Sequence, residues 1–217
     1  MSRLFCLLLA LLCLSSAWAA DPISLQLAAL EDPDKRLDLQ QVLEAGPQAG
    51  FTTFNRGFSG GYSRSAFWFR LSLGANPAPT DGLLEIQPPY LDDLRLYVRD
   101  ASQPGGYRER RGGDLLALAE RDYQYRSTVF RLPAQVWDNG PLYLRLETTS
   151  SALLIAKLWA TEDFQSAKIT EYGALGLYYG LLLTLILVLL WQGLWRRCFA
   201  PLGCAKRLWD GALPAGL

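Results

Sequence analysis

A long uncharged stretch near the C-terminus constrains the fold of this chain more than any other feature. Residues 172–195 read YGALGLYYGLLLTLILVLLWQGLW, and Arg196 and Arg197 follow directly. A helix needs roughly 20 mostly apolar residues to cross the hydrocarbon core of a bilayer. Tyrosines stand near one end of the stretch and tryptophans near the other, where amphipathic rings favour the headgroup region. The sequence therefore predicts one transmembrane helix over residues 172–195.

The two ends of the chain predict its orientation. Arg3 precedes an apolar run too short to span a bilayer, and Ala17 and Ala19 supply the small residues of a cleavage site, so residues 1–19 are predicted to be a signal peptide. Basic residues after the span outnumber those shortly before it, which favours a cytoplasmic C-terminus. We expect a protein of a bacterial inner membrane, with residues 20–165 in the periplasm and a short cytoplasmic tail over residues 196–217.

Composition excludes several classes of function. All four cysteines lie outside residues 20–165, and a cysteine-free exported domain is typical of a bacterial periplasm. With His 0, the chain has no Ser-His-Asp or Cys-His catalytic set and lacks the common zinc ligand sets. A formal net charge of +0 gives no footprint for nucleic acid. We expect no cofactor, metal or nucleic-acid partner and no enzyme, although paired carboxylates among Asp92, Asp93, Glu109 and Asp114 leave glycan hydrolysis open.

The exported region is predicted to be all-β. Short alternating runs separated by Gly, Pro, Asn and Asp are typical of a β-sandwich. Strands are expected at residues 66–73, 82–86, 93–99, 127–132, 141–147 and 151–159. Residues 21–61 are less regular, with a short helix at 37–43. Gly112 and Gly113 are expected to form a turn that closes two strands.

Three of these strands divide their residues in the same way. Successive side chains of a strand point to opposite faces, so one apolar face is expected to pack against a second sheet. The other face carries the six candidate site residues, which are Trp68, Arg70, Arg95, Tyr97, Tyr143 and Arg145. Aromatic rings stack on sugars, and the planar fork of arginine recognises carboxylates and hydroxyl-rich groups. This face is a predicted ligand site; the alternative is a solvated face whose residues serve only cross-strand pairing.

The order of short motifs along the chain resembles a known receptor family. The motifs are LEDP at 30–33, AFWFRL at 66–71, LRLYV at 94–98, GD at 113–114, VFRL at 129–132, LYLRL at 142–146 and GLYYG at 176–180. Together they resemble the bacterial seven-transmembrane receptors with diverse intracellular signalling modules, in particular their second type of extracellular domain, over residues 21–190. The resemblance implies a periplasmic jelly-roll β-sandwich similar to carbohydrate-binding modules, followed by the first of seven membrane helices.

The sequence after residue 190 departs from this family pattern. No further run of spanning length and no output module follow, so we expect a truncated or frameshifted receptor, with a free-standing anchored sensor as the alternative. The leading interpretation is the periplasmic ligand-sensing domain of a signal-transduction receptor, which binds a small, carbohydrate-like molecule. A partner receptor or self-association is left open. The alternative function is a protein-interaction adaptor anchored in the inner membrane, and a cell-envelope glycan-active enzyme comes third.

Overall fold

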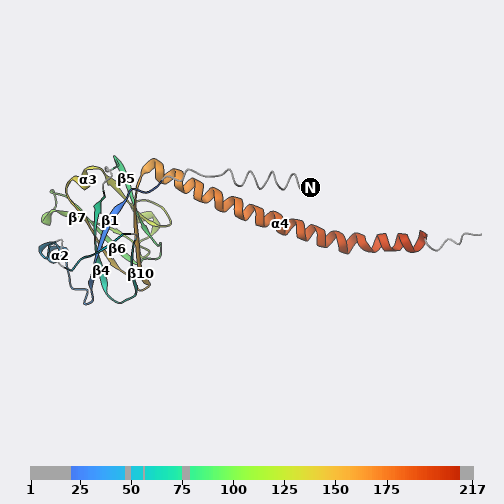
Figure 1. Cartoon of the computed structure of the whole chain (residues 1–217), viewed down its shortest axis with the longest axis horizontal. Coiled ribbons are helices and arrows are strands. Elements are labelled where there is room, and N and C mark those ends of the chain that lie inside the picture. The colour runs from blue at the N-terminus through green and yellow to red at the C-terminus, as the bar shows by residue number, and fades with distance from the viewer. Residues whose placement is uncertain (1–20, 47–49, 56, 75–78, 211–217) are drawn as a thin grey trace, which may run out of the picture. The chain divides into compact units, whose positions relative to one another are not determined.

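The computed structural model describes residues 21–46, 50–55, 57–74 and 79–210, with side chains as far as Leu194. The described residues fall into two compact units that divide after Ser166. The first unit carries the ten described strands, and the second is the part of the C-terminal helix that begins at Ala167 (Figure 1). The predicted signal peptide lies outside the described residues.

The strands of the first unit form two antiparallel sheets. The larger sheet has the order β2-β1-β4-β9-β6-β7, and the smaller has the order β3-β10-β5-β8. The strands are β1 (Leu25–Asp32), β2 (Thr52–Phe54), β3 (Phe58–Tyr62), β4 (Ala66–Leu73), β5 (Asp81–Gln87), β6 (Asp93–Arg99), β7 (Tyr107–Gly112), β8 (Thr128–Pro133), β9 (Leu142–Glu147) and β10 (Ser151–Ala160). Short helices α2 (Leu39–Glu44) and α3 (Gln135–Asp138) and the 3-10 turns η1 (Pro104–Gly106) and η2 (Leu118–Glu120) lie between strands.

The core lies between the two sheets. Phe67, Phe69 and Leu71 of β4 are at most 3% exposed and pack in one cluster with side chains from both sheets, such as Leu84 and Phe130. The same parity is buried in β6 and β9, so the apolar face predicted from alternation is confirmed. The all-β prediction is confirmed as a sandwich of two antiparallel sheets. The jelly-roll connectivity stays a prediction.

The predicted strands are all present, with ends shifted by a residue at most, and the helix expected at 37–43 is α2. Strands β1, β2, β3 and β7 were not predicted. β7 reads YRERRG and lies at the edge of the larger sheet, where charged side chains discourage pairing with other chains, so it lacks an apolar alternation. β3 reads FSGGY, and because glycine is disfavoured in strands, its sequence gives only a weak strand signal.

Helix α4 (Thr161–Asp210) begins at the residue after β10, whereas the sequence predicted a helix from Tyr172. The early turns were missed because they carry charged side chains; Glu162 and Asp163 in the first turn favour a helix N-terminus. Residues 196–210, which belong to the tail predicted over residues 196–217, continue the helix. Among the described residues, α4 is the one helix long and apolar enough to cross a membrane, over Thr161–Leu194.

Candidate ligand-binding site

The six predicted site residues lie side by side on the outer face of the larger sheet. They come from β4, β9 and β6, which are neighbours in that order. Trp68 pairs with Arg145, and Arg145 pairs with Arg95, which makes one row across the three strands. Arg70 pairs with Tyr143, and Tyr143 pairs with Tyr97, which makes the second row. The structure therefore brings all six residues together, as two cross-strand rows of three.

The aromatic members of this group are covered by α2 and the residues beside it. Trp68 is 1% exposed and Tyr143 is 6% exposed, and both pack in one cluster with Val42 of α2. The Trp68 ring stacks on Tyr97 at 5.5 Å between centroids and an interplanar angle of 24°. Burial, with a further contribution from the charge of Glu109, raises the pKa of Tyr97 to about 12. This part of the sheet is thus a second small core.

The cover itself follows from local sequence. Asp38 caps α2: its side chain accepts a hydrogen bond from the backbone N–H of Gln41, and the Gln41 side chain accepts one from the N–H of Asp38. This reciprocal capping box satisfies amide donors that a helix N-terminus leaves free. It allows a helix of only six residues to form and to place Val42, which is 1% exposed, against the sheet.

Two of the three arginines of the group form ion pairs toward one end of the strands. Arg95 makes a two-atom contact with Asp93, with Nε and Nη2 at 2.9 and 2.8 Å from Oδ2. This hydrogen bond raises the pKa of Arg95. Arg145 lies 3.1 Å from Glu147. Arg70 points elsewhere, with its guanidinium 5.6 Å from the centre of the Phe51 ring.

An open hollow of about 500 Å³ lies beside these ion pairs, and we call it the polar hollow. It is formed by the β1–α2 loop, the start of β6, the end of β7 with the loop that follows, and the end of β9. Its lining residues are Lys35, Asp92, Asp93, Arg95, Arg111, Gly112, Leu115, Leu116, Glu147, Thr148 and Thr149. Of the six predicted residues, Arg95 lines the hollow directly, and Arg145 contacts the lining residue Glu147.

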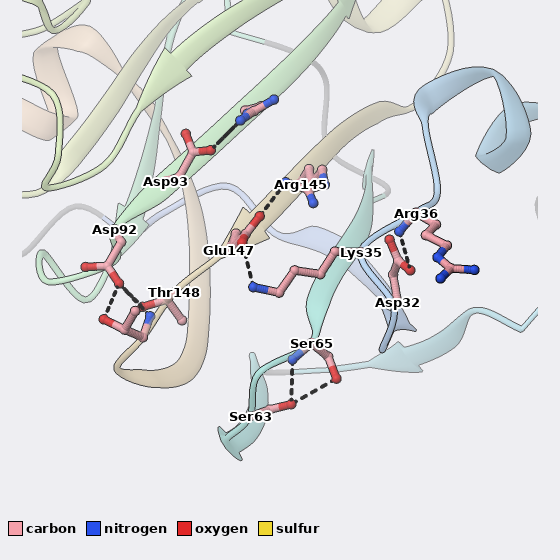
Figure 2. Close-up of polar contacts among 12 residues, drawn as sticks. Asp32, Lys35, Arg36, Ser63, Ser65, Asp92, Asp93, Arg145, Glu147 and Thr148 are labelled. Atoms are coloured by element: carbon pink, nitrogen blue, oxygen red, sulfur yellow. Dashed lines mark hydrogen bonds and ion pairs between the residues drawn. The ribbon is translucent and has the colours of Figure 1, made fainter.

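The charges that line the polar hollow are balanced. Three lining side chains are cationic and three are anionic. Lys35 reaches from the β1–α2 loop to Glu147 at 2.6 Å, and Arg145 approaches the same carboxylate from within β9 (Figure 2). Arg111 lies 3.7 Å from Asp93, which also holds Arg95. The hollow thus offers hydrogen-bond donors and acceptors side by side.

Asp92 anchors one wall of the hollow. Its Oδ2 accepts hydrogen bonds from the Thr149 backbone N–H at 2.5 Å, the Thr149 hydroxyl at 2.8 Å and the Thr148 hydroxyl at 3.2 Å. The bond from the Thr149 backbone is the largest of the effects that lower the pKa of Asp92. These bonds fix the segment after β9 against the segment before β6.

Lys35 is placed by the LEDP segment. Asp32 is 3% exposed and accepts hydrogen bonds from the backbone N–H groups of Arg36 and Leu37 at 3.2 and 3.0 Å. The same turn puts Lys35 at φ 58, a left-handed conformation uncommon for a residue with a Cβ. The tight turn directs the Lys35 side chain to Glu147, whose pKa this hydrogen bond lowers.

Gly113 shapes the adjoining wall; the predicted turn begins there, but the prediction that it closes two strands was wrong. Gly112 ends β7, and the chain then crosses toward β8 in the other sheet, so the two glycines do not close a hairpin. Gly113 has φ 108, and a Cβ there would lie 2.2 Å from the carbonyl oxygen of Asp92. Only glycine permits this close approach, which lets the N–H of Leu115 bond that same carbonyl at 3.2 Å.

Sequence reasoning missed most of the lining residues. Lys35 and Glu147 are 112 positions apart, and neither lies on a motif that points to a ligand. A usable signal was the chemistry at strand ends: Asp92 and Asp93 stand at the start of β6, and Thr148 and Thr149 follow β9, its antiparallel neighbour. Adjacent antiparallel strands bring such ends together. Within the described ranges, no group of three or more Cys, Asp or Glu residues is arranged to hold a metal ion.

The fold and the hollow together indicate a class of protein. A two-sheet β-sandwich that carries a charge-balanced hollow and is followed directly by one apolar helix fits the class of membrane-anchored extracellular domains. The family model of the 7TMR-DISM extracellular 2 domain matches residues 24–160, and the chain belongs to this family of receptor sensor domains. The recognition made from the sequence motifs is confirmed, and the domain before the helix is periplasmic. No curated protein matches the sequence.

Proposed function

We propose that the chain is the ligand-sensing domain of a membrane signal-transduction receptor, and that the polar hollow binds a small, uncharged, carbohydrate-like molecule. The observation that carries this proposal is the charge balance of the hollow. Each ion pair in the lining, such as Arg95 with Asp93, sets a donor beside an acceptor. A hydroxyl group both donates and accepts, so it can bond both members of such a pair. A ligand with a net charge gains less, because the three cations and three anions of the lining offset one another.

The size and chemistry of the hollow support a ligand of this class. A volume of about 500 Å³ lies within the range of small-molecule sites. Leu115, 80% exposed, and Leu116 add apolar surface to the lining, against which the C–H face of a sugar ring can pack. In the same proposal, Arg95 contacts the ligand and Arg145 orients Glu147. Trp68, Tyr97, Tyr143 and Arg70 support the strands from behind rather than stack on the sugar, because α2 covers the aromatic rings.

The proposed orientation of the helix in the membrane follows from the charges at its end. In this proposal the helix after the domain crosses the inner membrane with its C-terminal end in the cytoplasm, which the basic residues after the apolar segment support. The domain then acts as a receptor module, with no catalytic step of its own.

The test is a thermal-shift titration of the full chain in detergent micelles with a panel of neutral mono- and disaccharides. A sugar at about 100 times its Kd stabilises the folded state by about 2.7 kcal/mol, which raises Tm measurably. Arg95→Gln is expected to abolish the shift. Arg108→Gln is the matched control, because Arg108 of β7 pairs with Asp100 and does not line the hollow.

Two results would count against the proposal. If no neutral sugar shifts Tm but a formally charged metabolite does, the ligand class is wrong. If no small molecule shifts Tm and the chain instead binds a purified periplasmic protein, the adaptor function is favoured.

A further inference from the structure

The first turn of α4 is held by three aromatic rings. Phe164 is 2% exposed, and its ring meets those of Tyr123, Tyr125 and Trp159 at 5.8, 5.3 and 6.3 Å between centroids. All three contacts are edge-to-face, the arrangement that aromatic quadrupoles favour. We call the three rings the aromatic cage. Because Phe164 belongs to the first turn of α4, the cage determines where that helix starts on the sandwich.

A buried carboxyl group fixes the Trp159 ring of the cage. Glu85 of β5 is fully buried and accepts hydrogen bonds from the Trp159 indole N–H at 3.1 Å, the Ser127 hydroxyl at 2.9 Å and the Gln87 amide at 2.9 Å. Three donors thus converge on this one buried carboxyl group. The Trp159 ring is therefore held in one orientation, and Phe164 packs against a surface that is already ordered.

Arg121 joins the polar hollow to this cage. Its side chain is only 11% exposed, although it lies in the long loop between β7 and β8. The Nε–H donates to the carbonyl oxygen of Leu116 at 3.2 Å, and an Nη1–H donates to the carbonyl oxygen of Tyr125 at 3.5 Å. Leu116 lines the hollow, whereas Tyr125 belongs to the cage. One planar guanidinium thus bonds both structures at once.

The segment that Arg121 bonds at the hollow is also held by backbone hydrogen bonds. The N–H groups of Asp114 and Leu115 donate to the carbonyl oxygens of Leu91 and Asp92 at 2.7 and 3.2 Å. Asp92 is the residue that ties the wall of the hollow to Thr149. A ligand that contacts this wall therefore meets a segment that Arg121 also bonds, through the carbonyl oxygen of Leu116.

We infer that Arg121 is a positioning residue that couples the polar hollow to the start of α4, through Leu116 on one side and Tyr125 and Phe164 on the other. The role of this coupling in sensing rests on the proposed function of the hollow. α4 continues without a break from Thr161 into its apolar segment, so a change in the first turn is passed along one helix. Coupling between two sites is reciprocal, which allows it to be tested from either end and without a ligand.

The experiment is amide hydrogen exchange on the full chain in detergent micelles, with no ligand added. Phe164→Leu keeps an apolar side chain but loses the aromatic contacts, and it is expected to raise exchange in the first turns of α4. By reciprocity it also raises exchange at residues 114–118, by about five-fold or more. In the Arg121→Gln background, Phe164→Leu adds nothing at residues 114–118. Arg108→Gln, a matched control on β7, leaves the response of both segments to Phe164→Leu as in the wild type.

Two outcomes overturn the inference. In the first, Phe164→Leu raises exchange in α4 alone. In the second, its effect on residues 114–118 persists without Arg121. If Arg121→Gln fails to fold, Arg121→Lys, which keeps the charge but lacks the planar fork, is judged by the same criterion. Failure of the sugar titration would leave this result unaffected, because no ligand takes part in the exchange experiment.

Discussion

Lys35 Nζ lies 2.6 Å from Glu147 Oε1, so the loop between β1 and α2 is fastened to the last residue of β9. Arg145 approaches the other carboxylate oxygen of Glu147 at 3.1 Å. The Glu147 carboxylate therefore joins two parts of the domain. One is the β1–α2 loop, which leads into the helix that covers the sheet, and the other is the cross-strand row that contains Arg145 and Arg95. This contact closes one side of the polar hollow.

Glu147→Gln is expected to flatten the acid limb of the stability profile. The hydrogen bond from Lys35, followed by that from Arg145, lowers the pKa of Glu147 below its ordinary value of 4.5. A lowered pKa in the folded state contributes stability above the unfolded pKa, and this contribution is lost as pH falls through the folded pKa. Because both side chains are more than a third exposed, solvent screening limits the contribution to about 0.5 kcal/mol.

The measurement is urea denaturation of the full chain in micelles between about pH 6 and about pH 3, a range that brackets the ordinary pKa of glutamate. Glu44→Gln is the control, since Glu44 is exposed at the end of α2. An equal change in slope for the two variants would show that the contact with Lys35 does not stabilise the fold.

Gly113→Ala is expected to destabilise the domain by roughly 2–4 kcal/mol, the sum of backbone strain and steric overlap. The added Cβ would meet the Asp92 carbonyl oxygen at 2.2 Å, and φ 108 is unfavourable for any L-residue. Gly106→Ala isolates the backbone effect, because Gly106 has φ +73 but nothing within 4 Å of its Cβ position. It is expected to cost only about 1 kcal/mol. If Gly113→Ala and Gly106→Ala have the same denaturation midpoint, that result contradicts the close approach at Gly113.

The strands that the sequence predicted are those with a local signal. In β4, β6 and β9 apolar residues alternate with polar ones, and alternation follows from burial of one face. The outer face was harder to interpret, because α2 covers Trp68 and Tyr143, and this cover produces no periodic pattern in the sequences of β4 and β9. Whether a polar and aromatic face is open or covered depends on a helix from elsewhere in the chain.

The polar hollow was beyond sequence reasoning for a related reason. Its walls combine the β1–α2 loop with the ends of β6, β7 and β9, and the register between these strands sets which side chains meet. Asp93 lies opposite Glu147 in that register, although strands β7 and β8 lie between them in the sequence. Arg95 and Arg145 were found because they share a face with aromatic residues. Their partners at the strand ends were found only in three dimensions.

Asp38→Ala is expected to loosen α2 and expose the small core beneath it. Loss of an N-cap acceptor costs about 1 kcal/mol, and a helix of six residues has few other contacts to hold it. Faster amide exchange is expected in α2 and at Trp68, with no change in β5 or β8 of the other sheet. Asp38→Asn, which keeps an acceptor oxygen, serves as the control. Unchanged exchange in Asp38→Ala would mean that packing of Val42 alone holds the helix in place.

Asp92→Ala is expected to lower stability by about 2 kcal/mol, because three hydrogen bonds to one carboxylate are lost. Asp92→Asn keeps one acceptor oxygen without the charge and should recover part of the loss.

The lowered pKa of Asp92 means that the stability advantage of the wild type is present above the ordinary value of 3.8 and is lost as pH falls through the lower pKa of the folded state. Asp34→Ala, an exposed carboxylate in the β1–α2 loop, is the control, measured by urea denaturation at neutral and acid pH. If Asp92→Ala is as stable as Asp34→Ala, Thr149 is satisfied by water, and the wall of the hollow does not depend on Asp92. If Asp92→Ala is destabilised as expected, it should also lose any thermal shift with neutral sugars, because the Asp92 carboxylate lines the hollow and holds Thr148 and Thr149, which line it too.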